Sequence, residues 1–313
     1  MTVRPLTIGL LVTGCTAAPL WLTNEAVLFY FSLVLVWSIF AVGFDLVFGL
    51  AGMLSLGHAA FFGTGAFVHA VLSMQAGWPF AASLLAAGVA GMVLAAAFGA
   101  VTLRSTGVFF ALTTQALAQL AYVLAATRLS PWTGGLDGLA GVPRPQIGSW
   151  DPFDPRVFYA VLAVIFLAAM GGAAMLRASP FGQVLLGIRQ NPTRSLQLGF
   201  NVRRFKLAAF AISGFYSAVA GALLAALMSF VSPQIMQWTV SGDLLVMVLL
   251  GGTGTLFGPV LGVALIELLR EELAGVTEHW LGLLGLIFVL CTIFLPEGLA
   301  GAWDRIMPGR RAS

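Results

Sequence analysis

A few ionisable side chains interrupt the long apolar stretches of this chain, and they are the residues whose types could do chemistry. Asp45, Asp243, Glu267 and Arg270 all lie in or near runs of leucine, valine and alanine. One charge at the centre of a bilayer costs about 2.5–3.5 kcal/mol on insertion scales, so such a charge is paired or lines a polar pathway. Glu267 and Arg270 are three residues apart and can pair on one helical face; lining a pathway is the alternative.

His58 is the titratable residue of a glycine-rich segment, Gly52 to Phe67. No acidic residue lies near it in sequence, so we expect a neutral imidazole hydrogen-bonded to a neighbouring helix, with a role in a pathway as the alternative. The other histidines, His69 and His279, are distant in sequence, and no Ser–His–Asp pattern or metal-ligand spacing is present. The sequence therefore predicts no catalytic residue, no metal site and no cofactor.

The composition favours a membrane protein over a soluble one. Hydrophobic residues make up 59% of the 313 residues and charged residues only 9%, whereas about 25% of an ordinary soluble domain is charged. So few charges cannot cover a water-facing surface. The net charge of +3 comes mostly from arginines, whose positions along the chain indicate membrane orientation and not nucleic acid binding.

Windows of about 20 apolar residues, the length that crosses about 30 Å of hydrocarbon, follow one another along the chain. They predict an all-α, polytopic transmembrane helix bundle of about ten spans, a single domain over residues 1–313 with no soluble domain attached. The first window resembles a signal peptide, but we expect it to be kept as a span because so many spans follow. The windows are residues 6–22, 27–44, 50–73, 80–103, 108–127, 157–176, 206–229, 235–251, 255–274 and 279–295.

The basic residues predict which side of the membrane each loop occupies, because lysine and arginine accumulate in cytoplasmic loops. With both termini in the cytoplasm, eleven basic residues lie inside and four outside. We therefore expect a periplasmic loop at 128–156, with ordered proline-rich turns, and a cytoplasmic loop at 177–206. The eleven are Arg4, Arg104, Arg177, Arg189, Arg194, Arg203, Arg204, Lys206, Arg305, Arg310 and Arg311, and the four are Arg128, Arg144, Arg156 and Arg270.

The cytoplasmic loop carries two helix starts. Ser179-Pro180 and Asn191-Pro192 each place a capping residue before a proline at the first helical position. Gly199 is suited to end the second helix. The loop is thus predicted to form two short helices, Phe181 to Gln190 and Pro192 to Leu198.

The first of these helices has an apolar side formed by Leu185, Leu186 and Ile188. An apolar patch on a cytosolic loop indicates a partner surface. The alternative is a helix that lies on lipid headgroups, with Arg189 and Arg194 on anionic lipid.

Two glycine-rich segments interrupt the spans, Gly52 to Phe67 in the first half and Met247 to Gly262 in the second. Glycine weakens a regular helix and permits a break that lines a cavity. Interrupted segments at matching places in two halves point to a translocation pathway. The residues expected along it are Ser55, Gly57, His58, Asp243, Gly251, Gly252 and Gly254.

Four stretches of the chain resemble one known family. They read GLAGMLSLGHAAFFGTGAF from Gly49, TGGLDGLAGVP from Thr133, FGQVLLGIRQNPTRSLQLGFNVRRFKLAAFAISGFYSAVAGAL from Phe181 and LLGGTGTLFGPVLG from Leu249, and the ending FLPEGLAG from Phe294 also fits. Through them the chain, from about Phe40 onward, resembles the permease subunit of bacterial ATP-binding-cassette (ABC) importers of branched-chain amino acids, of the LivM type.

This resemblance implies a multi-pass inner-membrane permease that is not itself an enzyme. It implies a heterodimer with a homologous sister permease, two cytosolic ATPase subunits that hydrolyse the ATP, and a periplasmic substrate-binding protein. It also implies that the two short helices of the loop are coupling helices that dock on the ATPases. The residues assigned to this coupling are Phe181, Gly182, Leu185, Ile188, Arg189 and Asn191; the chain departs from the family pattern at Gln190 and at Pro192 to Leu196.

Two alternatives remain at this stage. The same type of importer could carry urea, short amides or other amino acids, since the binding protein largely selects the cargo. An ion-coupled secondary transporter would instead place a carboxylate such as Asp45 or Glu267 in its pathway and would need no ATPase. A stable complex with an ATPase separates the second alternative from the importer.

Overall fold

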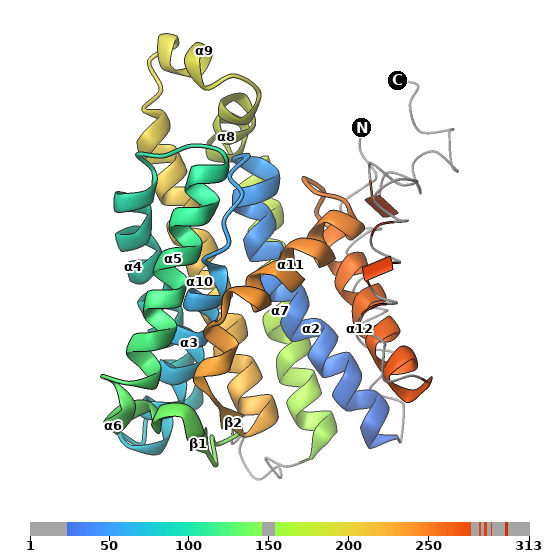
Figure 1. Ribbon diagram of the computed structural model, residues 1–313. Helices are drawn as coiled ribbons and strands as arrows, with labels where there is room; N and C mark the ends of the chain where they lie inside the picture. Colours follow the sequence, from blue (N-terminus) through green and yellow to red (C-terminus); the bar gives the residue numbers. More distant parts are fainter. Residues whose placement is uncertain are drawn as a thin grey trace.

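The computed structural model of the protein describes residues 24–145 and 154–276, together with residues 282, 285, 286, 289, 298 and 299 (Figure 1). Its long helices are, in chain order, α2 (Glu25–Asp45), continued by the π-helix η2 (Leu46–Leu50), then α3 (His58–Met74), α4 (Phe80–Thr102), α5 (Val108–Ala126), α7 (Pro155–Ala178), α10 (Val202–Met228), α11 (Trp238–Gly251) and α12 (Gly258–Val276). Each coincides with one of the expected windows, whereas the windows at 6–22 and 279–295 lie outside the described residues.

Five described helical segments are long and apolar enough to cross a membrane, which confirms a helical membrane protein. They are Glu25–Leu50, Phe80–Thr102, Val108–Ala126, Pro155–Ala178 and Val202–Met228. Large apolar side chains point outward from them, such as Phe109, which is 75% exposed, and Val93, which is 62% exposed. A soluble protein rarely carries so much exposed apolar surface, so these faces suit lipid or another apolar partner.

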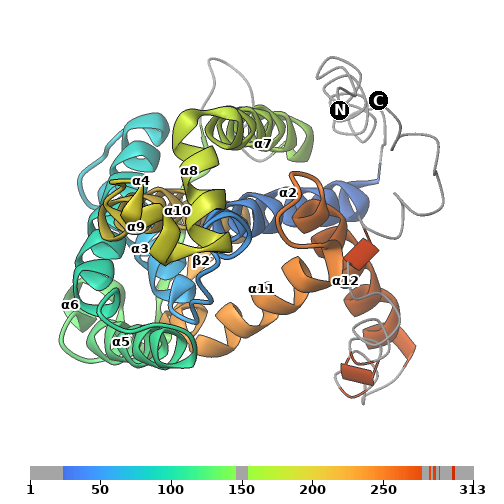
Figure 2. The ribbon, with the colours of Figure 1, turned by 90° about the horizontal axis from the view of Figure 1, so that it is seen from above.

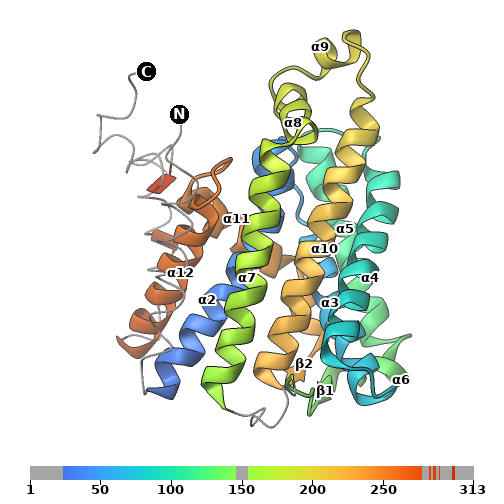
Figure 3. The same ribbon diagram turned by 180° about the vertical axis from the view of Figure 1, so that it is seen from behind.

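Helix α10 lies at the centre of the bundle, packed against α2, α3 and α4 (Figure 3). Small residues allow this approach: a Cβ atom added to Gly65 of α3 would collide with the backbone of Ala218, and one added to Gly221 of α10 would collide with Phe62. Such close backbone contact is how helices gain packing energy inside a membrane, where association gains little from the hydrophobic effect.

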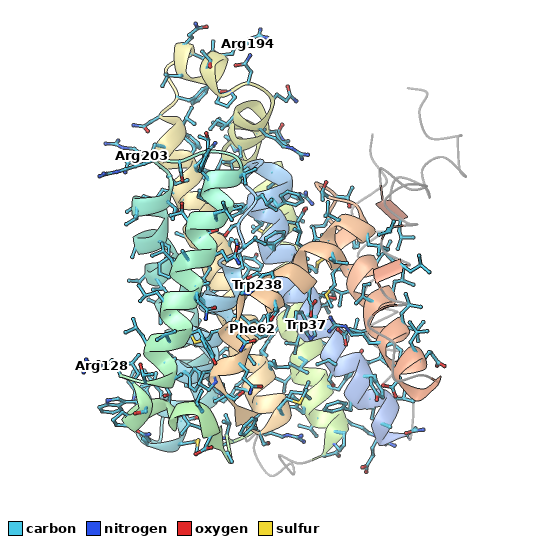
Figure 4. The ribbon with its side chains drawn as sticks, in the orientation of Figure 1. Trp37, Phe62, Arg128, Arg194, Arg203 and Trp238 are labelled. Carbon is cyan, nitrogen blue, oxygen red and sulfur yellow. The ribbon has the colours of Figure 1, made fainter. Side chains whose placement is uncertain are left out.

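Aromatic rings fill the space between α2 and α3. Phe40 and Phe62 stack with their centroids 4.4 Å apart. Trp37 stacks on Phe62 with 5.8 Å between centroids (Figure 4). Both phenylalanines are fully buried. These contacts fix the angle at which the two helices cross.

Two units of the chain run in opposite directions. The first consists of α2 with η2, a non-helical segment at 51–57, and α3; the second consists of α10, a segment at 229–237, and α11. Figures 1 and 3 show α10 antiparallel to α2, and the first turn of α11 meets the start of α3 where the Ala59 amide donates to Ser241 Oγ at 2.9 Å. The segment at 229–237 joins α10 to α11 as 51–57 joins η2 to α3, and it contains no glycine. The expected match between the glycine-rich segments Gly52 to Phe67 and Met247 to Gly262 stays a prediction.

The described first part of the expected periplasmic loop, residues 128–145, forms ordered turns at the end of the bundle away from α8 and α9 (Figure 1). It contains the short helix α6 (Ser130–Thr133), the 3-10 turn η3 (Gly135–Asp137) and the strand β1 (Leu139–Ala140). Strand β1 pairs antiparallel with β2 (Phe230–Val231), the one strand pair among the described residues. This pair, which the sequence did not predict, ties the loop to the segment between α10 and α11.

Candidate functional site

The loop between α7 and α10 forms the two predicted helices, α8 (Pro180–Gln190) and α9 (Pro192–Gln197). The predicted caps are confirmed: Ser179 Oγ accepts from the Gly182 amide at 3.3 Å, and Asn191 Oδ1 accepts from the Arg194 amide at 2.9 Å. Gly199 follows α9 with a φ of +88°, the left-handed conformation that ends a helix. Both helices project from one end of the bundle (Figure 1).

The apolar side of α8 faces its own bundle. Leu185 and Ile188 are fully buried, and α8 packs on α7, α10 and η2. Phe181 stacks on Phe205 of α10 with 5.5 Å between centroids. These three residues therefore hold α8 in place, and the idea that the apolar side of α8 is left open for a partner was wrong.

Gly182 lies at the junction of α7 and α8. A Cβ atom there would collide with the Leu176 carbonyl and would lie 2.9 Å from the Arg177 Cα atom. Glycine is needed here so that α8 can fold back against the end of α7. Replacing it disturbs this junction as well as any docking surface.

Two apolar side chains, on α9 and in the turn that follows it, are exposed to solvent. Leu196 is 63% exposed and Leu198 is 70% exposed. They lie at the tip of the loop, beside the region where Arg194 and Arg203 point outward (Figure 4). This tip, and not the apolar side of α8, is the exposed apolar surface of the loop.

Arg189 of α8 turns toward the first glycine break. Its Nη1 atom donates to the Gly49 carbonyl, and its Cγ atom would lie 2.9 Å from a Cβ atom on Gly52. Gly52 has a φ of +68°, a backbone conformation that residues other than glycine rarely adopt. The guanidinium also reaches the second break, because Nη1 lies 3.0 Å from where a Cβ atom of Gly254 would be.

Asp45, at the end of α2, joins this cluster from within the bundle. The residue is only 2% exposed. Its Oδ2 atom lies 3.1 Å from Arg177 Nη2, and its Oδ1 atom accepts from the Gly254 amide at 2.9 Å. We call Asp45, Arg177, Arg189, Gly49 and Gly254 the arginine clamp.

The first break is held open by hydrogen bonds to its backbone. The Leu56 amide donates to Thr114 Oγ1 at 3.1 Å, and the Gly57 amide donates to Ser55 Oγ at 3.2 Å. The Ala59 amide at the start of α3 donates to Ser241 as described above. Non-helical backbone at membrane depth is stable only with such partners. The side chains of α5 and α11 therefore help to define the shape of the break.

Removing one of these partners makes a specific test of the break. Thr114→Ala is expected to lower the free energy of unfolding by about 1–3 kcal/mol, since the partly buried Leu56 amide loses this hydrogen bond. Thr113 is the matched control because its hydroxyl bonds only within α5, to the Phe109 carbonyl. The measurement is the thermal unfolding midpoint in detergent. Equal midpoints for Thr113→Ala and Thr114→Ala would contradict this assignment.

His58 is hydrogen-bonded to a neighbouring helix, as the sequence predicts. Its Nε2 atom lies 2.8 Å from Ser213 Oγ of α10, and the residue is fully buried. Phe44 and Phe210 approach the ring edge-on, with centroids 4.9 and 5.6 Å away. The histidine thus joins α3 to α10 behind the first break.

The pairing of Glu267 with Arg270 is confirmed, and it includes a third residue. Arg270 Nη1 lies 3.4 Å from Glu267 Oε1, and Arg270 Nη2 lies 2.7 Å from Asp243 Oδ2 of α11. The Asp243 side chain is 49% exposed. A half-exposed carboxylate at this depth suits a face covered by water or protein better than one covered by lipid.

The structure gathers the predicted site residues into three places. Ser55, Gly57 and His58 lie at the first break; Gly254 and Arg189 lie in the arginine clamp; Asp243 lies apart on α11. Gly251 packs against α12, and Gly252 begins the second break. Sequence reasoning missed the roles of Arg177, Thr114 and Ser241, and it identified Asp45 only as a buried charge. Among the described residues no group of His, Cys, Asp and Glu could hold a metal ion.

Comparison with known proteins is informative at this point. The chain matches the family described as "Branched-chain amino acid transport system / permease component" over residues 26–292. It is 31% identical, over 86% of its length and 68% of the relative, to the high-affinity branched-chain amino acid transport system permease protein LivM of Escherichia coli K12.

Two further relatives have related names. The LivM protein of Salmonella typhimurium LT2 is 29% identical over the same shares of both chains. The permease protein LivH of Escherichia coli K12 is 23% identical over 85% of this chain and 91% of its own. No solved structure matches the chain. The glycine breaks, the capped loop helices and this match together place the chain in the family of permease components of branched-chain amino acid transport systems.

Proposed function

We propose that the chain is the LivM-type permease subunit of an inner-membrane ABC importer that carries branched-chain amino acids. The observation that carries this proposal is the 31% identity to LivM over 86% of the chain. The proposed assembly pairs the chain with a LivH-like sister permease, two cytosolic ATPases and a periplasmic binding protein. The chain itself supplies one transmembrane permease domain of ten spans over residues 1–313, with both termini in the cytoplasm.

The distribution of basic residues supports this orientation. Arg194 and Arg203 lie at the end of the bundle that carries α8 and α9, whereas Arg128 lies at the opposite end (Figure 4). Arg177, at the end of α7, and Arg189, on α8, add to the positive charge at the first end. This end is the cytoplasmic one by the positive-inside rule.

In the proposed cycle a loaded binding protein docks on the loop at 128–156, and closure of the ATPases moves the coupling loop at 177–206. The solute path then lies beside the two breaks. Viewed along the bundle, α11 crosses from the side of α5 to α12 (Figure 2). Asp243, whose side chain is 49% exposed, lies on the exposed face of this helix. The sister permease would cover this face, so that the path runs between the two subunits.

No observation favours the ion-coupled alternative. The two carboxylates that would carry a coupled ion, Asp45 and Glu267, are both paired with arginines. An ion site needs a carboxylate that can release its partner in each cycle.

Uptake measured with purified components tests the proposal. The chain, co-purified with its partner subunits and placed in proteoliposomes, is expected to accumulate labelled leucine only with ATP and the loaded binding protein. Isoleucine and valine are expected to compete, and urea and acetamide are not. Uptake by the chain alone, or uptake that follows a proton gradient without ATP, would reject an importer; competition by urea alone would reject the cargo.

The tip of the coupling loop offers a separate test. Leu198→Glu is expected to reduce co-purification of the ATPase at least tenfold, because a charge replaces an exposed apolar contact at the docking surface. Leu136→Glu is the control, since this equally exposed leucine lies in η3 at the opposite end. Undiminished ATPase recovery with Leu198→Glu would remove the tip from the interface.

A further inference from the structure

The buried carboxylate of Asp45 contacts both the end of α7 and the second break, and it lies beside Gly49 of η2. We propose that Asp45 is a positioning residue that transmits movement of the coupling loop to both glycine breaks. This inference rests on the proposed function, because it takes α8 as the helix that the ATPase moves. Neither the family description nor the names of the relatives assigns this residue a role.

The two oxygens of Asp45 have different partners. Oδ2 pairs with Arg177, the first residue of the coupling loop, at 3.1 Å. Oδ1 accepts from the Gly254 amide in the second break at 2.9 Å. The first residue of the loop and the second break are thus fixed to the same rigid carboxylate, although they are far apart in sequence.

The first break is tied to the same point. Gly49 lies one turn after Asp45, and a Cβ atom there would occupy the position of the carboxylate, within 2.7 Å of Oδ2. The Gly49 carbonyl accepts from Arg189 of α8. A π-helical turn, η2, separates Asp45 from the break, and such turns occur often at functional sites. Displacement of α8 therefore reaches η2, next to the first break, through Arg189. It reaches the second break through Arg177, at the end of α7 that directly precedes α8.

Stability alone does not account for an ion pair at this depth. The Asp45 side chain is 3% exposed and that of Arg177 is 16% exposed. Apolar packing of the same shape is usually as stable as a buried ion pair, or more so. An ion pair adds directional bonds that hold two separate segments in one geometry. This property is what a part that transmits movement requires.

The test compares uptake with ATP hydrolysis in the reconstituted importer. Asp45→Asn and Arg177→Gln are each expected to lower uptake at least tenfold while basal ATP hydrolysis continues and its stimulation by loaded binding protein is lost. Uptake by the double variant is expected to be no lower than uptake by the less active single variant, because both changes break one linkage. Arg177→Lys keeps the charge and is expected to recover part of the uptake.

Arg104→Gln is the matched control, because this exposed arginine lies in the loop between α4 and α5 at the same end of the bundle. Its uptake is expected to equal that of the unmodified chain. Unchanged uptake in Asp45→Asn would overturn the proposal. So would a loss of uptake in the double variant equal to the product of the two single losses. So would a failure of Asp45→Asn and Arg177→Gln to accumulate in the membrane, since the role would then be structural. If the unmodified complex shows no ATP-driven uptake, the proposed function fails instead.

Discussion

Gly221→Ala is expected to leave little folded protein in the membrane, whereas Gly171→Ala is expected to accumulate normally. A Cβ atom on Gly221 would lie 2.6 Å from the Phe62 carbonyl carbon, and this backbone cannot move without separating α10 from α3. Overpacking of this kind costs about 1–3 kcal/mol or more. Because α10 packs closely against α2, α3 and α4, its displacement affects the whole bundle.

Gly171 provides the matched comparison within another long span. It lies in α7, and no atom lies within 4 Å of a Cβ atom placed on it. The measurements are the amount of protein in the membrane fraction and the unfolding midpoint in detergent. Equal amounts and midpoints for the two variants would show that α10 and α3 do not pack as closely as described.

Gly251→Ala is expected to abolish uptake while the protein still accumulates in the membrane. A Cβ atom on Gly251 would collide with the Gly258 carbonyl and would lie 2.9 Å from the Gly262 amide nitrogen. The change therefore separates α11 from α12, next to the second break. The central packing of α10 on α3 and α4 does not involve these residues, so the bundle should remain folded.

Gly275→Ala is the control for this second variant, because Gly275 also lies in α12 and nothing lies within 4 Å of its added Cβ atom. Uptake of labelled leucine, divided by the amount of protein in the membrane, is the quantity to compare. Normal uptake by Gly251→Ala would mean that the contact of α11 with α12 is not needed during transport.

Local signals in the sequence were enough to predict the coupling loop. Ser179 and Asn191 each accept from an amide three residues away, so the starts of α8 and α9 were predicted to within one residue. The break at 51–57 was also predictable, since Gly52 adopts a φ that other residues avoid. Gly63 and Gly65, which also belong to the predicted segment Gly52 to Phe67, lie inside regular α3 and permit close contact between helices instead.

Tertiary relations were not predictable in the same way. Asp45 and Arg177 are 132 residues apart, and nothing near either residue indicates its partner. The spacing of apolar residues along α8 predicts an apolar side, but it does not tell whether a partner or the same chain covers that side. In the structure the same chain covers Leu185 and Ile188. The segment at 229–237 carries no glycine, so its non-helical backbone had no strong signal.

Helices α3 and α11 are short, and this affects how the chain enters the membrane. Helix α3 has 17 residues and α11 has 14, so they reach about 26 and 21 Å, less than the roughly 30 Å of hydrocarbon. During synthesis, α3 emerges long before α10, the helix on which it packs most closely. Until residues 202–241 leave the ribosome, His58 and the Ala59 amide at the start of α3 lack their hydrogen-bond partners Ser213 and Ser241, so these polar groups need other partners during insertion.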